Sequence, residues 1–264
     1  MNINDLFNPN EKPLDNLVSD GGFCGIFRKI GCIGDSLSSG EFEGVSPEGN
    51  RTYHDFYDYS WGQYLARMAG CTVYNFSRGG MTAKEYILSF AQANGFWDHD
   101  KACQAYIIAL GVNDLCNQGQ ELGTMEDIDF RNYKNNKPTF TGYYARIIQA
   151  YKRIQPDAKF FLMTMPSHGP NDPKDDIRAA HAQRLYDLAE AFENCYVLDL
   201  RQYGPVYDEA FNKKFFLGHM TPTGYVLTAK MVASYIDYII RHNMEDFAQV
   251  GFIGTEHQFR EDLL

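Results

Sequence analysis

Apolar stretches of two lengths alternate along this chain. Short apolar runs predict buried strands, and longer segments with apolar residues three or four positions apart predict amphipathic helices. Strands are expected near 30–34, 72–76, 105–110, 158–164 and 195–199, and helices near 60–69, 82–93, 142–154, 175–192 and 222–241. This alternation is typical of a parallel sheet covered by helices. We therefore expect an α/β fold, a three-layer α/β/α sandwich with a central, mostly parallel five-stranded sheet that is flavodoxin-like in outline.

The length of the chain favours a single domain. A chain of 264 residues can bury one substantial core, and α/β folds of this size are commonly one domain. We predict a core at 29–241, an N-terminal arm or small cap at 1–28 and a C-terminal extension at 242–264. Apolar residues of the extension need cover from the body of the domain or from a second subunit, so oligomerisation through it stays open. These residues are Phe247, Val250, Phe252, Ile253 and Phe259.

Composition places the chain among ordinary globular proteins. Hydrophobic residues make up 44% and charged residues 22%, which are typical values. No window approaches 18 uninterrupted apolar residues, so no membrane span is expected. The first residues, Met-Asn-Ile-Asn-Asp-Leu-Phe-Asn, have neither a basic start nor an apolar core of signal-peptide length. The sequence as given predicts a cytoplasmic protein.

Charge and motif content exclude several classes of function. The formal net charge is −10, from 34 acidic and 24 basic residues, and binding to a phosphate backbone requires clustered Lys and Arg. Nucleic acid is therefore not an expected partner. Neither a Walker-type phosphate loop nor Gly-x-Gly-x-x-Gly occurs, and the cysteines and histidines lack metal-ligand spacing. We expect free thiols, no metal and no cofactor.

Polar motifs follow three of the predicted strands, at the edge where open α/β sheets bind ligands. Ser36, in the Gly-Asp-Ser-Leu sequence at 34–37, is placed to act as a nucleophile after the first strand. Gly80 ends a glycine pair after the second strand, where a backbone N–H can point into the crevice. Asn113 follows the third strand, and its amide could stabilise a developing negative charge. Each motif alone also fits an ordinary turn or a helix cap.

Two histidines are candidates for a base. His219 stands on the loop before the last predicted helix, from which it could lean over the crevice, although a surface or capping role is the simpler interpretation. His168 follows the fourth strand and is a second candidate for a base or a substrate contact, with a solvated loop histidine as the alternative.

The order of these motifs resembles that of the GDSL-type esterases and lipases, also called the SGNH hydrolases after a Ser, a Gly, an Asn and a His. The resemblance spans roughly residues 29–241 and implies the SGNH hydrolase fold. It implies Ser36 as the nucleophile and His219 as its base, with no metal. The implied oxyanion hole consists of the N–H groups of Ser36 and Gly80 and the side chain of Asn113. Such a site hydrolyses carboxylic esters.

One position departs from the family pattern. The family usually carries an Asp three residues before the histidine, and Phe216 occupies that position here. The resemblance therefore supports a Ser36–His219 dyad, whose imidazole Nδ1 needs another acceptor. A backbone carbonyl is the first choice, and Asp208 or Glu209 are the substitutes. If nothing replaces the carboxylate, we expect a slower enzyme or a non-catalytic carbohydrate-binding protein on the same scaffold.

Long connections near the site bear on the substrate. Residues 38–60 carry several aromatic rings among carboxylates, and they form either a wall over Ser36 or a loop packed on the sheet edge. Open polar and aromatic loops favour short acyl groups, such as acetyl esters on a small molecule or a carbohydrate. The enzymatic alternative is a lysophospholipase or thioesterase acting on longer chains, which would require a contiguous apolar groove that the sequence does not locate.

Overall fold

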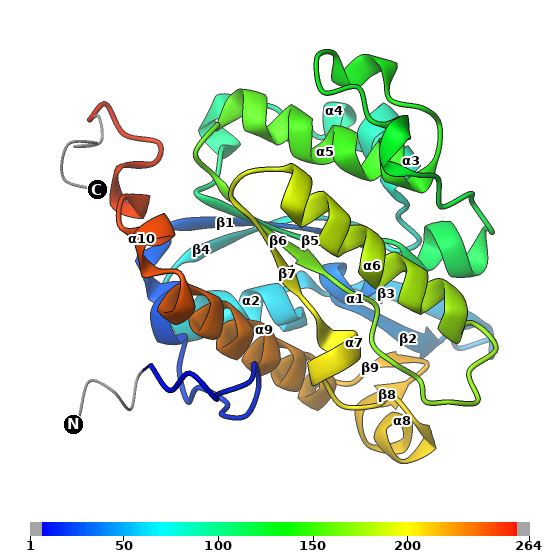
Figure 1. Ribbon diagram of the computed structural model, residues 1–264. Helices are drawn as coiled ribbons and strands as arrows, with labels where there is room; N and C mark the ends of the chain where they lie inside the picture. The colour runs from blue at the N-terminus through cyan, green and yellow to red at the C-terminus, as the bar shows by residue number, and fades with distance from the viewer. Residues whose placement is uncertain (1–6, 258–264) are drawn as a thin grey trace.

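A parallel sheet forms the centre of the molecule (Figure 1). The computed structural model describes residues 7–257. The strands of the sheet stand in the order β4-β1-β5-β6-β7, and all neighbours are parallel. Their bounds are Lys29–Gly34 for β1, Thr72–Ser77 for β4, Ala105–Ala109 for β5, Lys159–Met163 for β6 and Cys195–Leu198 for β7. This is the flavodoxin-like order, in which the chain adds β4 on one side of β1 and the later strands on the other. Ligands bind at that reversal, beyond the carboxyl ends of the strands.

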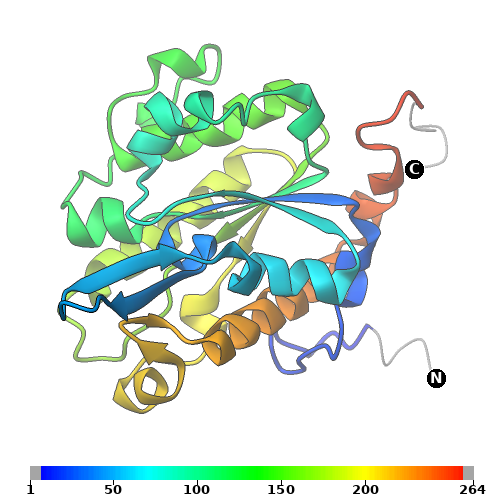
Figure 2. The same cartoon turned by 180° about the vertical axis from the view of Figure 1, so that it is seen from behind.

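Helices cover both faces of the sheet (Figures 1 and 2). α2 (Trp61–Ala69) and α9 (Pro222–His242) pack on one face, and α5 (Phe140–Ile154) and α6 (Asp175–Ala191) pack on the other. Successive strand residues point to opposite faces. Ile107 accordingly belongs to the core beneath α2 and α9, whereas Ile108 belongs to the core beneath α5 and α6. The predicted three-layer α/β/α sandwich is confirmed.

The predicted helix at 82–93 is interrupted. It consists of α3 (Ala83–Glu85), a wider π-type turn over Tyr86–Phe90 and α4 (Ala91–Ala93). Further short turns of helix occur at Gly22–Ile26, Tyr57–Tyr59, His99–Lys101, Val112–Asn117, Met125–Asp127, Tyr133–Asn135 and Val250–Phe252. The remaining short helices are α1 (Ser36–Ser39), α7 (Leu200–Tyr203), α8 (Glu209–Phe215) and α10 (Met244–Phe247).

The connection at 38–60 contains an antiparallel hairpin outside the main sheet. Its strands are β2 (Glu41–Val45) and β3 (Arg51–Asp55), which pair with each other. A second, minimal hairpin joins β8 (Phe216–Leu217) to β9 (His219–Met220). Both hairpins and α8 lie at the end of the sheet opposite the two termini (Figures 1 and 2).

The aromatic rings of this connection are partly packed and partly exposed. Phe42 packs inward, with ring centroids 5.6 Å from Tyr225 and 5.9 Å from Phe56. Tyr53, Phe56 and Tyr59 keep about half of their surface exposed, at 53%, 52% and 49%. Phe42 thus anchors the hairpin, while Tyr53 on β3 and the following Phe56 and Tyr59 present their rings to solvent.

The terminal segments pack on the α2–α9 face. Val18 N–H donates to Ser234 Oγ at 2.9 Å, and Phe23 N–H donates to Asp237 Oδ1 at 2.8 Å. Phe247, Val250 and Ile253 of the C-terminal extension are buried within the same core. Most of the extension's apolar surface is therefore covered by the domain itself. Phe252 stays 39% exposed, and Phe259 lies outside the described residues.

None of the helices within residues 7–257 combines the length and the apolar character that crossing a bilayer requires.

Candidate active site

One open cavity of about 390 Å³ at the carboxyl end of the sheet brings the four sequence-predicted residues together. Ser36, Gly80, Asn113 and His219 all line it. They follow β1, β4, β5 and β8, so segments that are distant in sequence converge at the reversal of strand order. The other lining residues are Asp35, Leu37, Glu41, Val112, Asn117 and Gly218.

A tight turn from β1 into α1 presents Ser36. The Asp35 side chain caps α1 by accepting a hydrogen bond from Leu37 N–H at 3.1 Å. A Cβ at position 34 would overlap Ser38 Oγ, so only glycine fits where the strand ends. Burial raises the pKa of Asp35 to about 6, although the Leu37 N–H and the nearby His219 oppose this shift. Ser36 thus stands half-buried on a helix start, beside a carboxyl that is easily protonated.

The candidate oxyanion donors lie across the cavity. Gly80 adopts a left-handed conformation with φ of +72°, which few other residues tolerate. Asn117 Nδ2 donates to Asn113 Oδ1 at 2.8 Å and so fixes which way the Asn113 amide faces. Asn113 Nδ2 donates to Met81 O at 3.1 Å and to Asp35 Oδ2 at 3.4 Å. The second contact is long and weak, which leaves that hydrogen available to a ligand oxygen.

Two carboxylates hold the ring of His219. Nδ1 lies 3.0 Å from Glu43 Oε1, and Nε2 lies 3.0 Å from Glu41 Oε1. The three side chains are mostly buried, with 20% of the histidine and 13% and 17% of Glu41 and Glu43 exposed. Glu41 and Glu43 are two residues apart on β2, so their side chains share one face of the strand. Glu43 therefore occupies the place of the carboxylate that the sequence lacked at Phe216.

The prediction that Asp208 or Glu209 replaces that carboxylate was wrong. Asp208 caps α8 by accepting from Phe211 N–H at 2.8 Å, and Glu209 pairs with Lys213 at 2.6 Å. The Nδ1 partner is also a side chain rather than a backbone carbonyl. Sequence reasoning missed Glu43 because it lies 176 residues before His219.

Glycines make room for both carboxylates. A Cβ at position 218 would overlap the carboxylate of Glu43, and one at position 79 would overlap Glu41 Oε2. Gly218 also has φ of +75°, so a side chain there would be strained as well as obstructed. Arg51, opposite on the hairpin, places its Nε 3.3 Å from Glu43 Oε2 and helps to hold that carboxylate.

In this structure, Nε2 of His219 contacts Glu41 and not Ser36. Among the described residues, Ser36 Oγ makes no hydrogen bond to His219, because Glu41 occupies Nε2. Burial raises the pKa of Glu41, while the His219 charge opposes this and the charges of Asp55 and Glu43 add to it. Glu41 and Ser36 line the same cavity and compete for one nitrogen.

His168 does not lie in this cavity. It lines a separate, neighbouring apolar cavity, where its ring stands 6.0 Å from that of Tyr207. Burial, together with the nearby Arg178, lowers its pKa. The prediction of His168 as an alternative base at Ser36 is therefore not supported by its position.

Comparison with known proteins finds one matching family. The model of the GDSL-like lipase/acylhydrolase family matches residues 32–227. No curated protein matches the chain in sequence.

Several solved structures share the fold. A family two carbohydrate esterase from Clostridium thermocellum, in complex with cellohexaose, is 19% identical with a TM-score of 0.55, and the match covers 89% of this chain and 66% of that one. A carbohydrate esterase family 2 enzyme with a carbohydrate binding domain, from Corynascus thermopiles (Myceliophthora fergusii), is 16% identical with a TM-score of 0.55, covering 81% and 66%. The acetyl xylan esterase AlAXEase is 17% identical with a TM-score of 0.51, covering 79% and 99%. At such identities these likenesses establish the fold alone.

Proposed function

Because the chain belongs to the GDSL-like lipase/acylhydrolase family and is an esterase or acylhydrolase, we propose that it cleaves carboxylic esters with Ser36 as nucleophile and His219 as base. The observation that carries this proposal is the convergence of Ser36, Gly80, Asn113 and His219 on one cavity, with Glu43 on the far nitrogen of the histidine. Each element of a serine hydrolase site is then supplied.

The first step forms an acyl-enzyme. His219 Nε2 exchanges Glu41 for the Ser36 hydroxyl and takes its proton as Oγ bonds to the ester carbonyl carbon. Glu43 accepts the Nδ1–H, which leaves the lone pair on Nε2 and stabilises the imidazolium that forms. The imidazolium then gives its proton to the leaving alcohol as the ester C–O bond breaks.

The negative charge on the carbonyl oxygen is held by three donors. These are the backbone N–H groups of Ser36 and Gly80 and the Nδ2–H of Asn113, which turns from Asp35 to the oxyanion. Water then attacks the acyl-enzyme with His219 again as its base, and the acid and free Ser36 are released.

The non-catalytic alternative loses its main support. It rested on Phe216 at the position of the expected carboxylate, and Glu43 now meets the same imidazole nitrogen at 3.0 Å. A protein that only bound sugars would have no need for a buried carboxylate on that atom.

For the alcohol portion of the substrate, we propose a carbohydrate or a similarly polar small molecule. The exposed ring of Tyr53 lies on the hairpin that carries Glu41 and Glu43, and those of Phe56 and Tyr59 lie on the segment that follows it. Such rings can stack on sugars. The names of the carbohydrate esterases with the same fold support this choice. The sequence-based expectation of an acetyl group rested on the open polar and aromatic loops near the site. The longer-chain alternative requires an apolar groove, and the next subsection describes an apolar cavity.

The proposal is tested by labelling the protein with a fluorophosphonate and assaying p-nitrophenyl esters alongside. We expect an adduct on Ser36, and loss of both labelling and turnover by more than about 10³-fold in Ser36→Ala. Ser89→Ala, an exposed serine outside the cavity, serves as the matched control and should behave as the wild type. Sugar binding without a Ser36 adduct or any ester turnover would favour the non-catalytic alternative.

A further inference from the structure

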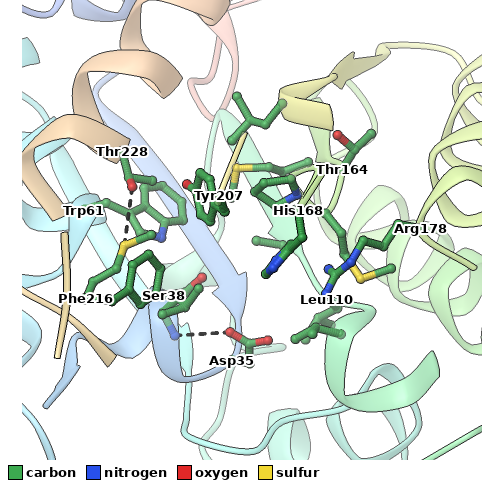
Figure 3. A pocket seen from close by; sticks show the side chains of 18 of the residues that line it. Asp35, Ser38, Trp61, Leu110, Thr164, His168, Arg178, Tyr207, Phe216 and Thr228 are labelled. Atoms are coloured by element: carbon green, nitrogen blue, oxygen red, sulfur yellow. Dashed lines mark hydrogen bonds between the residues drawn. The ribbon is translucent and has the colours of Figure 1, made fainter. Parts of the chain in front are cut away.

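A second cavity, of about 370 Å³, adjoins the first (Figure 3). Asp35, Leu37, Val112 and Gly218 line both cavities. Each of these residues is a neighbour in sequence of Ser36, Asn113 or His219, so the shared wall lies directly beside the reacting groups. The second cavity runs from this wall between the ends of β5 and β6 and the N-terminal part of α9.

The walls of the second cavity are predominantly apolar. Figure 3 shows Trp61 and Phe216 on one side and Leu110 on the other. Met163, Leu200 and Met220 add further apolar surface. Phe216, at the position where the family carries an acid, thus contributes to an apolar wall.

Most polar groups around this cavity already have protein partners. The Thr164 hydroxyl donates to Asp199 Oδ1 at 3.0 Å, and the Thr228 hydroxyl donates to Gly224 O at 3.0 Å. Arg178 is paired with Asp172 at 2.7 Å, and Asn212 Nδ2 donates to Tyr207 O at 3.1 Å. These groups therefore do not need a polar ligand to complete their hydrogen bonds.

Three polar groups need separate mention. Asp35, in the shared wall, accepts a hydrogen bond from Leu37 N–H at 3.1 Å. Ser38 Oγ is buried without a hydrogen-bond partner, at the end of the cavity next to Ser36. The lowered pKa of His168 favours its neutral form. A pocket with an apolar lining and so few free polar atoms suits a hydrocarbon group better than a sugar.

The chemistry of ester cleavage indicates which part of the substrate would enter the second cavity. His219 must protonate the leaving alcohol, so the alcohol lies on the side of Nε2, where Glu41 and the charged hairpin stand. The oxyanion points to Gly80 and Asn113. The acyl chain is the remaining substituent of the carbonyl carbon, and the cavity behind Leu37 and Val112 is the apolar space next to it.

We propose that this cavity binds the acyl chain, so that the enzyme prefers esters of medium-length acids to acetyl esters. An apolar cavity of ~150 Å³ holds the six carbons of benzene, and this one is more than twice as large, so it has room for a chain of at least about eight carbons. The inference rests on the proposed function, since it assumes that Ser36 attacks the carbonyl. It replaces the expectation of an acetyl group.

The test is the dependence of kcat/KM on chain length for p-nitrophenyl esters from acetate to dodecanoate. Burial of one methylene corresponds to a factor of about four in rate. We expect kcat/KM to rise by roughly this factor per added carbon until the cavity is filled, and then to level off or fall.

Two variants change the volume of the cavity in opposite directions. Ala109→Leu adds bulk at a lining position, and we expect it to lower kcat/KM for the octanoate ester by at least about tenfold while the acetate ester changes by less than about twofold. Met163→Ala removes bulk and should move the optimum to longer chains. Met68→Ala replaces a half-buried methionine that does not line the cavity, and is the matched control.

The outcomes separate this inference from the proposed function. A flat or acetate-centred profile that both variants leave unchanged, with Ser36-dependent activity intact, overturns the acyl site and leaves the esterase standing. An optimum at medium chains that moves with Ala109→Leu and Met163→Ala supports the acyl site. Loss of all ester turnover from the wild type would remove both proposals together.

Discussion

Glu43 Oε1 lies 3.0 Å from Nδ1 of His219, so a strand near the N-terminus supplies the carboxylate for a histidine near the C-terminus. The contact is possible because Gly218 leaves space for the Glu43 carboxylate and Arg51 approaches its other oxygen. A single strand, β2, thereby presents one carboxylate to each nitrogen of the ring. The two glutamates are expected to contribute very unequally to catalysis.

Removal of Glu43 tests its role on Nδ1. We expect Glu43→Ala to lower kcat by roughly 10²- to 10⁴-fold, because the imidazole loses both its fixed tautomer and the charge that stabilises the imidazolium. KM should change little, and Glu43→Asp should restore part of the rate. Glu48→Gln, an exposed change on the same hairpin, is the control. A Glu43→Ala enzyme with near-wild-type kcat would assign the carboxylate a structural role only.

Glu41 is expected to behave differently, since it occupies the nitrogen that Ser36 must reach. Glu41→Gln keeps the shape of the side chain and removes its charge. We expect activity to stay within about tenfold of the wild type. The amide has no charge to hold it on Nε2, so it leaves that nitrogen free for Ser36, and steady-state kinetics with a single ester measure the effect. A loss of activity as deep as that of Glu43→Ala would contradict this role.

Asn113 provides a direct test of the oxyanion hole. We expect Asn113→Ala to lower kcat by about 10²- to 10³-fold with little change in KM, because its N–H bonds to the oxygen mainly when that oxygen is charged. The exposed Asn171→Ala is a suitable control. Steady-state kinetics with a single ester suffice, and an effect within twofold would remove Asn113 from the hole.

The stability of the fold should depend on the ionisation of Asp114. Its side chain is buried, accepts a hydrogen bond from Ala83 N–H at 2.9 Å and has a second oxygen without a partner. Burial raises its pKa to about 7, against the opposing backbone N–H of Ala83. A pKa raised on folding contributes stability that is present below about pH 4 and is lost as the pH rises through about 7.

Replacing this carboxyl should therefore flatten the pH dependence. We expect Asp114→Asn to lose less unfolding free energy than the wild type between pH 5 and pH 8, by a few kcal/mol. The exposed Asp176→Asn is the control. Guanidinium unfolding at the two pH values measures the difference, and equal losses in wild type and Asp114→Asn would show that Asp114 is not responsible.

The main sheet could be predicted closely because its strands are buried on both faces. Such strands read as continuous apolar runs, and each one was placed to within one or two residues of its observed ends. Three of the candidate site residues, Ser36, Gly80 and Asn113, could be singled out for a related reason, since they follow strands whose carboxyl ends meet at one edge. His219 was singled out by its place before the last helix. In the sequence, Glu41 and Glu43 show only that two carboxylates are spaced two residues apart. Nothing in the sequence indicates that they contact His219, because that contact depends on where the hairpin lies.

The second, apolar cavity was not predictable for a different reason. Its lining comes from many segments, among them α2, β5, β6 and β9, and no single segment has the pattern of a groove. Phe216 illustrates the difficulty. In the sequence, Phe216 only marks the absence of the expected acid, whereas in the fold it forms part of the apolar wall of this cavity.

The central claim is that Ser36 is activated by a histidine held by Glu43. It is tested most directly by the rate at which a fluorophosphonate labels Ser36, with the adduct located by peptide mass spectrometry, in wild type and in Glu43→Ala. We expect the wild type to be modified at Ser36, and the variant to react at the same residue roughly 100-fold or more slowly. An adduct at another residue, or equal rates in the two proteins, would contradict the account.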